Sequence, residues 1–323
     1  MSITFPRELA DEIIDLLTGD SNSLKACSMM GRVWIPRSRL YLFESWICVL
    51  LPKNIRGFHE ILQSPYGCSF LPLIRSVKAA RYCWHHNDRY FDDIAADLRL
   101  VPVHTLELKL NGVVDAGNIN TLFCEGFAAA FPHITRLVLT CSFEGQPAPL
   151  INMICLSPAL QELHICPETS SFRPQMAKPL ATAVPPQGLC ILHLGCVYTA
   201  EPILEWLHQF NHLPNVKSLT LPLALPGRIR AESIVNAAFQ QLGDSLHHLS
   251  LPDCWNNVDL SPLRSIRTLI IQGGSGKEML SKLTAPALEY LSVDAEPDEQ
   301  AEVQEYLTSA RFPSLRKVDF QCF

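Results

Sequence analysis

Residues 246–251 read LHHLSL, and the same spacing of apolar residues returns in LQELHI at 160–165 and in VKSLTL at 216–221. In each hexamer, apolar residues occupy the first, fourth and sixth positions. The alternation over the last three positions predicts a strand with one buried face, because successive side chains of a strand point to opposite sides. We therefore expect a short strand in each hexamer.

The hexamer pattern occurs ten times, and the copies start 20 to 31 residues apart. They begin at Ile74, Val103, Ile134, Leu160, Leu189, Val216, Leu246, Ile266, Leu288 and Leu315. Several of the intervening segments, such as 203–210 and 234–242, carry apolar residues at helical spacing. Strands that alternate with helices predict a parallel sheet backed by helices, and repetition curves such a sheet into an arc.

This period and strand pattern resemble those of leucine-rich-repeat proteins. The resemblance implies an α/β fold in which an irregular leucine-rich-repeat solenoid carries a curved parallel sheet. An ordinary doubly wound α/β domain is the alternative that the same alternation allows.

The first 46 residues carry a different pattern, which begins with FPRELADEIIDLL at 5–17. Apolar residues recur there at helical spacing, and acidic residues occupy the other face. Residues 24–30 and 36–43 predict two further short helices, and Trp34 lies between them. Three helices this short bury little surface alone, so their apolar faces need a neighbour.

The order of these features resembles an F-box, with Phe5-Pro6-Arg7-Glu8-Leu9 at the start and Trp34 after the second helix. The chain departs from the family's pattern at Phe5, where leucine is usual. The resemblance covers about the first 46 residues. It implies that this segment binds a Skp-type adaptor and, through it, a cullin scaffold. The residues expected to bind the adaptor are Phe5, Pro6, Leu9, Ile13, Ile14, Leu17, Leu24, Cys27, Val33 and Trp34.

The expected organisation is an F-box-like helical segment at 1–48, a linker at 49–72 and a leucine-rich-repeat-like solenoid at 73–323. The resemblance implies a substrate-recognition adaptor of an SCF-type ubiquitin ligase, which is not itself an enzyme. The alternative is a non-catalytic leucine-rich-repeat scaffold with an N-terminal helical cap and no ligase link. A cap would bury Ile13, Leu17 and Trp34 against the repeat at Ile74, whereas an F-box would present some of them to a partner.

Composition narrows the remaining classes of function. The net charge of −6 argues against nucleic-acid binding. The absence of an apolar run of about 18 residues argues against a membrane span, and no signal pattern opens the chain. We therefore expect a cytoplasmic or nuclear protein. The twelve cysteines form no Cys-x-x-Cys pair, so we expect neither a zinc site nor any other metal or cofactor.

No motif predicts catalysis. The stretch GGSGK at 273–277 differs from a phosphate-binding loop, which needs Ser or Thr where Glu278 stands, and a turn is expected there. A hydrolase that uses Ser275 would lack any identifiable base. The expected target-binding residues lie between the buried strand positions, where side chains point outward together. These residues are Glu107, Arg136, Glu162, His164, His193, His248 and Tyr290. Their mixture of charge and aromatic character suits a protein target, which is not identified by the sequence.

Overall fold

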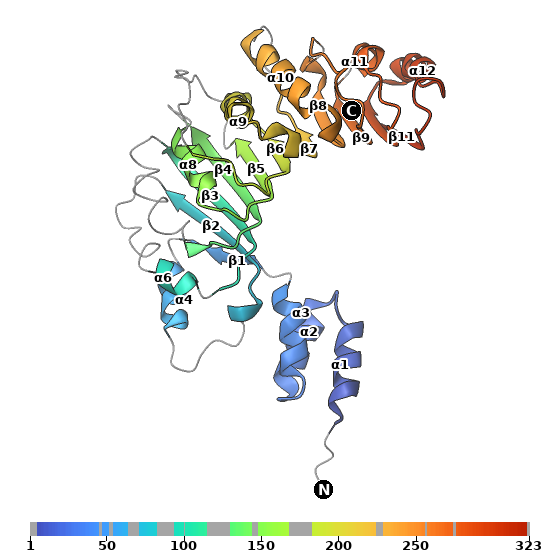
Figure 1. Ribbon diagram of the computed structural model, residues 1–323. Helices are drawn as coiled ribbons and strands as arrows, with labels where there is room; N and C mark the ends of the chain where they lie inside the picture. The colour runs from blue at the N-terminus through green and yellow to red at the C-terminus, as the bar shows by residue number, and fades with distance from the viewer. Residues whose placement is uncertain are drawn as a thin grey trace.

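The computed structural model describes residues 5–44, 47–51, 54–63, 71–82, 94–99, 101–114, 130–143, 148–167, 183–223, 229–255, 257–273 and 276–321. Within these residues the chain forms an α/β solenoid whose open, curved sheet has eleven strands (Figure 1). The strands follow one another across the sheet in sequence order, and every neighbouring pair is parallel. The fold class expected from the hexamer pattern is thus confirmed.

Each of the ten hexamers overlaps the start of one strand, from β2 to β11. The strands are β1 (Ile47–Leu50), β2 (Ser76–Tyr82), β3 (Thr105–Val114), β4 (Arg136–Phe143), β5 (Glu162–Pro167), β6 (Ile191–Leu194), β7 (Ser218–Thr220), β8 (His248–Pro252), β9 (Thr268–Gln272), β10 (Tyr290–Asp294) and β11 (Lys317–Gln321). β1 precedes the first hexamer and pairs with β2, so that Leu50 aligns with Ala79. The sheet therefore begins about where we expected the linker to start.

A single register aligns the apolar positions of neighbouring repeats. Leu163 pairs with Leu137 on one side and with Leu192 on the other, and Leu192 pairs in turn with Leu219. The three apolar side chains of every hexamer from 74–79 to 288–293 are buried. Full burial of one such side chain contributes about 1.5–3 kcal/mol. In the last hexamer the corresponding side chains are only half-buried, because β11 is the edge strand of the sheet that the described residues form.

Helices return the chain from one strand to the next. They are α4 (Ile55–Leu62), α6 (Ala95–Leu98), α8 (Ala148–Cys155), α9 (Val197–Gln209), α10 (Ile229–Leu242), α11 (Gly276–Lys282) and α12 (Pro297–Tyr306), with short 3-10 helices η1 (Leu71–Leu73), η3 (Leu213–Asn215), η4 (Gly243–Ser245) and η5 (Asp253–Trp255). Figure 1 shows α8 to α12 along one side of the sheet. Trp206 and Trp255 are buried in the core.

The GGSGK stretch contributes to packing at the start of α11. A Cβ atom on Gly276 would lie 2.5 Å from Val293 Cγ1, so only glycine lets the helix approach β10 this closely. This contact gives the glycine a structural role that needs no bound phosphate. Ser275 lies outside the described residues.

Three helices form the N-terminal unit: α1 (Arg7–Leu16), α2 (Ser21–Met30) and α3 (Ile35–Glu44). Asp20 caps α2, because its carboxylate accepts hydrogen bonds from the backbone N–H groups of Asn22 and Ser23. The unit lies beside the β1 end of the sheet, with α1 on the side away from the sheet (Figure 1). None of the described helices is long and apolar enough to cross a membrane.

The aligned core predicts a large loss of stability when one repeat loses a leucine. Leu163→Ala and Leu219→Ala should each lower the free energy of unfolding by about 2–5 kcal/mol, because both side chains are fully buried and each change leaves a cavity. Leu223→Ala is the matched control, since that side chain is 70% exposed. Thermal and urea unfolding would measure the change. Core variants as stable as the control would contradict this packing.

Candidate functional site

An exposed apolar stripe runs along α1. It consists of Leu9, Ile13 and Leu16, which recur at intervals of about one helical turn and are 47%, 40% and 87% exposed, together with Phe5, which lies just before the helix and is 39% exposed. The Phe5 ring stacks on Trp34, with 5.2 Å between the ring centroids. Apolar side chains at this spacing on a solvent-facing side of a helix are unusual unless a partner covers them. We call these four residues the α1 stripe.

A second apolar face of α1 packs inside the unit, where Ala10 and Ile14 are completely buried. The residues expected to bind an adaptor therefore fall into two groups. Phe5, Pro6, Leu9 and Ile13 are exposed and Leu17, Val33 and Trp34 half-buried, whereas Ile14, Leu24 and Cys27 are buried. Ile14, Leu24 and Cys27 therefore belong to the core of the helical unit, whereas the exposed group is accessible to a partner. Leu16, Met29 and Met30 are also exposed, although the motif did not point to them.

A polar cluster fixes α1 against α3. Arg37 donates two hydrogen bonds to the Asp15 carboxylate, at 2.7 and 3.0 Å, and the Tyr41 hydroxyl donates a third at 2.8 Å. The Arg37 guanidinium and the Tyr41 hydroxyl hold the pKa of the Asp15 carboxyl below its usual value. The cluster joins residues that lie 22 and 26 positions apart. It thereby sets the direction in which the α1 stripe faces.

On the sheet, the strand register arranges in rows the side chains that alternate with the buried apolar ones. Most of them are at least partly exposed, but Ser250 and Ser292 are buried. The middle row runs through Lys78, Glu107, Val138, His164, His193, Thr220, Ser250, Ile270, Ser292 and Asp319. A parallel row runs through Thr105, Arg136, Glu162, Ile191, Ser218, His248, Thr268, Tyr290 and Lys317. All seven residues expected to bind the target belong to these two rows.

Four of the seven form one connected group. Glu162 lies 3.6 Å from Arg136 and 2.5 Å from His164, measured between nitrogen and oxygen atoms. The His164 ring stacks on the ring of His193, with 5.1 Å between centroids. Burial lowers the pKa of His193, the neighbouring His164 lowers it further, and Glu162 opposes the shift. The group presents one cation, one anion and two imidazoles on adjacent strands.

The other three residues are separate from this group. Glu107 forms an ion pair with Lys78. The Tyr290 hydroxyl donates a hydrogen bond of 2.8 Å to Asp319, and the Lys317 ammonium lies over the Tyr290 ring. His248 lies on β8, between the strands that carry His193 and Tyr290. It is half-buried, and burial lowers its pKa.

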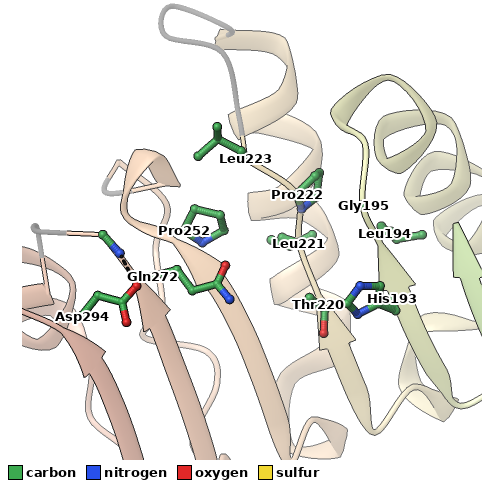
Figure 2. Close-up of a pocket in the computed structure, with 11 residues that line it drawn as sticks. His193, Leu194, Gly195, Thr220, Leu221, Pro222, Leu223, Pro252, Gln272 and Asp294 are labelled. Carbon is green, nitrogen blue, oxygen red and sulfur yellow. Dashed lines mark hydrogen bonds between the residues drawn. The ribbon is translucent and has the colours of Figure 1, made fainter. Parts of the chain in front are cut away.

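A third outward row lies at the carboxyl ends of the strands, one residue after the last apolar position. Sequence reasoning did not identify it. The part of this row at β6 to β10 consists of Gly195, Pro222, Pro252, Gln272 and Asp294. Glycine has no side chain and the proline rings stay close to the backbone, and the surface there has a hollow of about 540 Å³ (Figure 2). Lining residues from the neighbouring positions are His193, Leu194, Thr220, Leu221, Leu223 and Gly273.

The described residues contain no group of three or more His, Cys, Asp or Glu side chains that could hold a metal ion. The stacked rings of His164 and His193 and the carboxylate of Glu162 form a polar group on the surface of the sheet.

No protein-family model matches the chain, and no curated protein matches its sequence. A crystal structure of a protein from Bacteroides fragilis is similar with a TM-score of 0.47 and 15% sequence identity, over 76% of this chain and 74% of that chain. A chain of the yeast Rad7 and Elc1 complex is similar with a TM-score of 0.40 and 14% identity, over 97% of this chain and 87% of that chain. Similarities of this degree assign no function.

The stacked imidazoles predict a pH-dependent stability. The unfolded chain binds protons on His193 at a higher pH than the folded chain does, because the folded-state pKa is lowered. The free energy of unfolding should therefore be highest above about pH 6.5, the ordinary pKa of histidine, and should fall as the pH drops below it. Melting of the wild type and of His193→Gln at about pH 7.5 and about pH 5.5 measures this.

The melting temperature of His193→Gln should depend less on pH over this range than that of the wild type. His133→Gln is the matched control, since it makes the same substitution at an exposed histidine. An identical pH dependence in all three proteins would show that His193 does not carry the effect.

Proposed function

We propose that the chain is a substrate-recognition adaptor of an SCF-type ubiquitin ligase. In this proposal the N-terminal unit binds a Skp-type adaptor and, through it, a cullin scaffold. The outward face of the sheet holds a target protein, and other subunits carry out ubiquitin transfer. The proposal follows the F-box resemblance of residues 5–46 and the solenoid that comes after them.

The α1 stripe is the observation that carries the proposal. Leu9, Ile13 and Leu16 add an exposed apolar face to a helix whose other apolar face, at Ala10 and Ile14, is already buried. The helix therefore has more apolar surface than its own unit covers. Burial of a leucine or isoleucine side chain contributes about 1.5–3 kcal/mol when it is complete, and less where the side chain is already half-covered. A partner that covers the stripe would gain several such contributions.

The geometry of the unit also bears on the scaffold alternative. A cap would place its apolar residues against the first repeat, where Ile74 is completely buried. Ile13 instead is 40% exposed, and α1 lies on the side of the unit away from the sheet (Figure 1). This arrangement favours a partner-binding unit over a cap.

The two outward rows support the target-binding half of the proposal. Arg136, Glu162 and Tyr290 offer an exposed cation, an anion and an aromatic ring in one row of the sheet, with Tyr290 five strands away from Glu162. Arginine and tyrosine are enriched among the residues that dominate protein–protein binding energy. The strands hold the backbone at these positions at fixed spacing, so no backbone has to become ordered when a partner binds.

Co-purification with a Skp-type adaptor tests the proposal. The wild type should co-purify with the adaptor in a one-to-one ratio. The double variant Leu9→Asp/Ile13→Asp should reduce capture at least about tenfold, because it places charges in the apolar contact. Val184→Asp is the matched control, a charge placed on another apolar residue that is 66% exposed. Ile14 is unsuitable for this purpose, since a charge at a fully buried position would unfold the helices.

Circular dichroism and thermal melting would establish that the double variant remains folded. If the folded wild type captures no adaptor, or if the folded double variant captures as much as the wild type, the ligase assignment is wrong and the scaffold alternative holds.

A further inference from the structure

The hollow at the carboxyl ends of β6 to β10 combines apolar walls with hydrogen-bond acceptors. Pro222, Leu223 and Pro252 form its apolar side (Figure 2). Gln272 and Asp294 extend from the adjacent strands β9 and β10 at its other end. Leu223 is 70% exposed and therefore stands at the rim. An apolar wall beside a few convergent polar groups is the general composition of a specific binding site.

The charge of the hollow is one-sided. The Asp294 carboxylate is its only carboxylate, and none of the described residues that line it is Lys or Arg. The Asp294 side chain is more than nine-tenths buried. Thr220 and Gln272 add oxygen acceptors. His193 joins them, because its lowered pKa keeps the imidazole neutral at neutral pH and leaves a nitrogen lone pair. A cationic donor is the complement of this set.

The hollow is held in shape by hydrogen bonds. The Gly273 N–H donates to Asp294 Oδ2 at 3.1 Å, and Gly273 has a φ of 99°, which favours glycine. The Trp255 indole N–H donates to the Pro222 carbonyl at 2.8 Å from within the core. The Gly195 N–H donates to the Ile165 carbonyl at 2.7 Å. A site that is already ordered loses little entropy when it binds.

We propose that this hollow receives an arginine side chain from the target protein. The aliphatic part of the arginine packs against Pro222, Leu223 and Pro252, and the guanidinium donates to Asp294 and Gln272. Arginine fits better than lysine, because its planar fork can donate to two acceptors on neighbouring strands and because it is more weakly hydrated. This inference rests on the proposed target-binding function and specifies one group that the target must carry.

The test measures binding of a defined probe to the full chain. Nα-acetyl-arginine amide is titrated into protein with labelled leucine methyl groups, and the shifts of Leu221 and Leu223 are followed. Nα-acetyl-citrulline amide has the same shape without the charge, and Nα-acetyl-lysine amide has the charge without the fork. The arginine probe should shift both leucines and bind at least about tenfold more tightly than either of the others.

Variants locate the site. Asp294→Asn should weaken the arginine probe at least about tenfold while it keeps an oxygen that accepts from Gly273. Gln272→Lys should abolish binding, and this side chain is exposed, so the fold should tolerate it. Asp319→Asn makes the same change as Asp294→Asn on the adjacent strand, outside the hollow, and should leave the affinity unchanged.

Equal binding of the citrulline probe would overturn the charge argument, and equal binding of the lysine probe would overturn the choice of arginine. Absence of shifts at Leu221 and Leu223 in folded wild-type protein would overturn the site itself. Adaptor capture is measured separately at α1, so a failure here leaves the ligase assignment standing, and a failure there leaves this binding result standing.

Discussion

The in-register parallel pairing of eleven strands is the constraint on which the rest of the molecule depends. No single repeat can bury its own leucines, so each gains stability only when its neighbours cover it. The same register that stacks Leu137, Leu163, Leu192 and Leu219 inside the sheet also aligns the outward side chains in rows. The core and the candidate binding surface are therefore two faces of one alignment.

Much of the fold could be predicted, because the apolar spacing of the hexamer predicts both where a strand lies and which of its faces is buried. Ten strands and the cores of α9 and α10 follow from apolar spacing alone. β1 could not be predicted in this way, since the sequence has Ser45 where the hexamer pattern needs its first apolar residue. The sequence also could not separate the two apolar faces of α1. Ile13 and Ile14 are adjacent and chemically identical, and only the position of α3 decides which of them is buried.

The sequence likewise predicts one part of the candidate target-binding surface and not the other. Side chains that point outward from a strand, such as His164 and His193, could be assigned by alternation, and their stacking follows from the pairing of β5 with β6. The hollow could not, because it depends on the absence of a side chain at Gly195 and on the compact rings of Pro222 and Pro252. A signal was present: comparison of the residue after the last apolar position across repeats would have revealed two prolines and a glycine in successive copies.

The sequential order of the strands has a consequence for how the molecule melts. Each strand contacts only the strands before and after it, so the solenoid behaves as a one-dimensional chain of coupled units. In such a chain the repeat whose core is least covered opens at the lowest cost in free energy. β11, whose apolar side chains are half-buried, is the weaker of the described ends, whereas the opposite end has Leu50 fully covered. A lesion in a central repeat would divide the chain into two blocks that melt at separate temperatures.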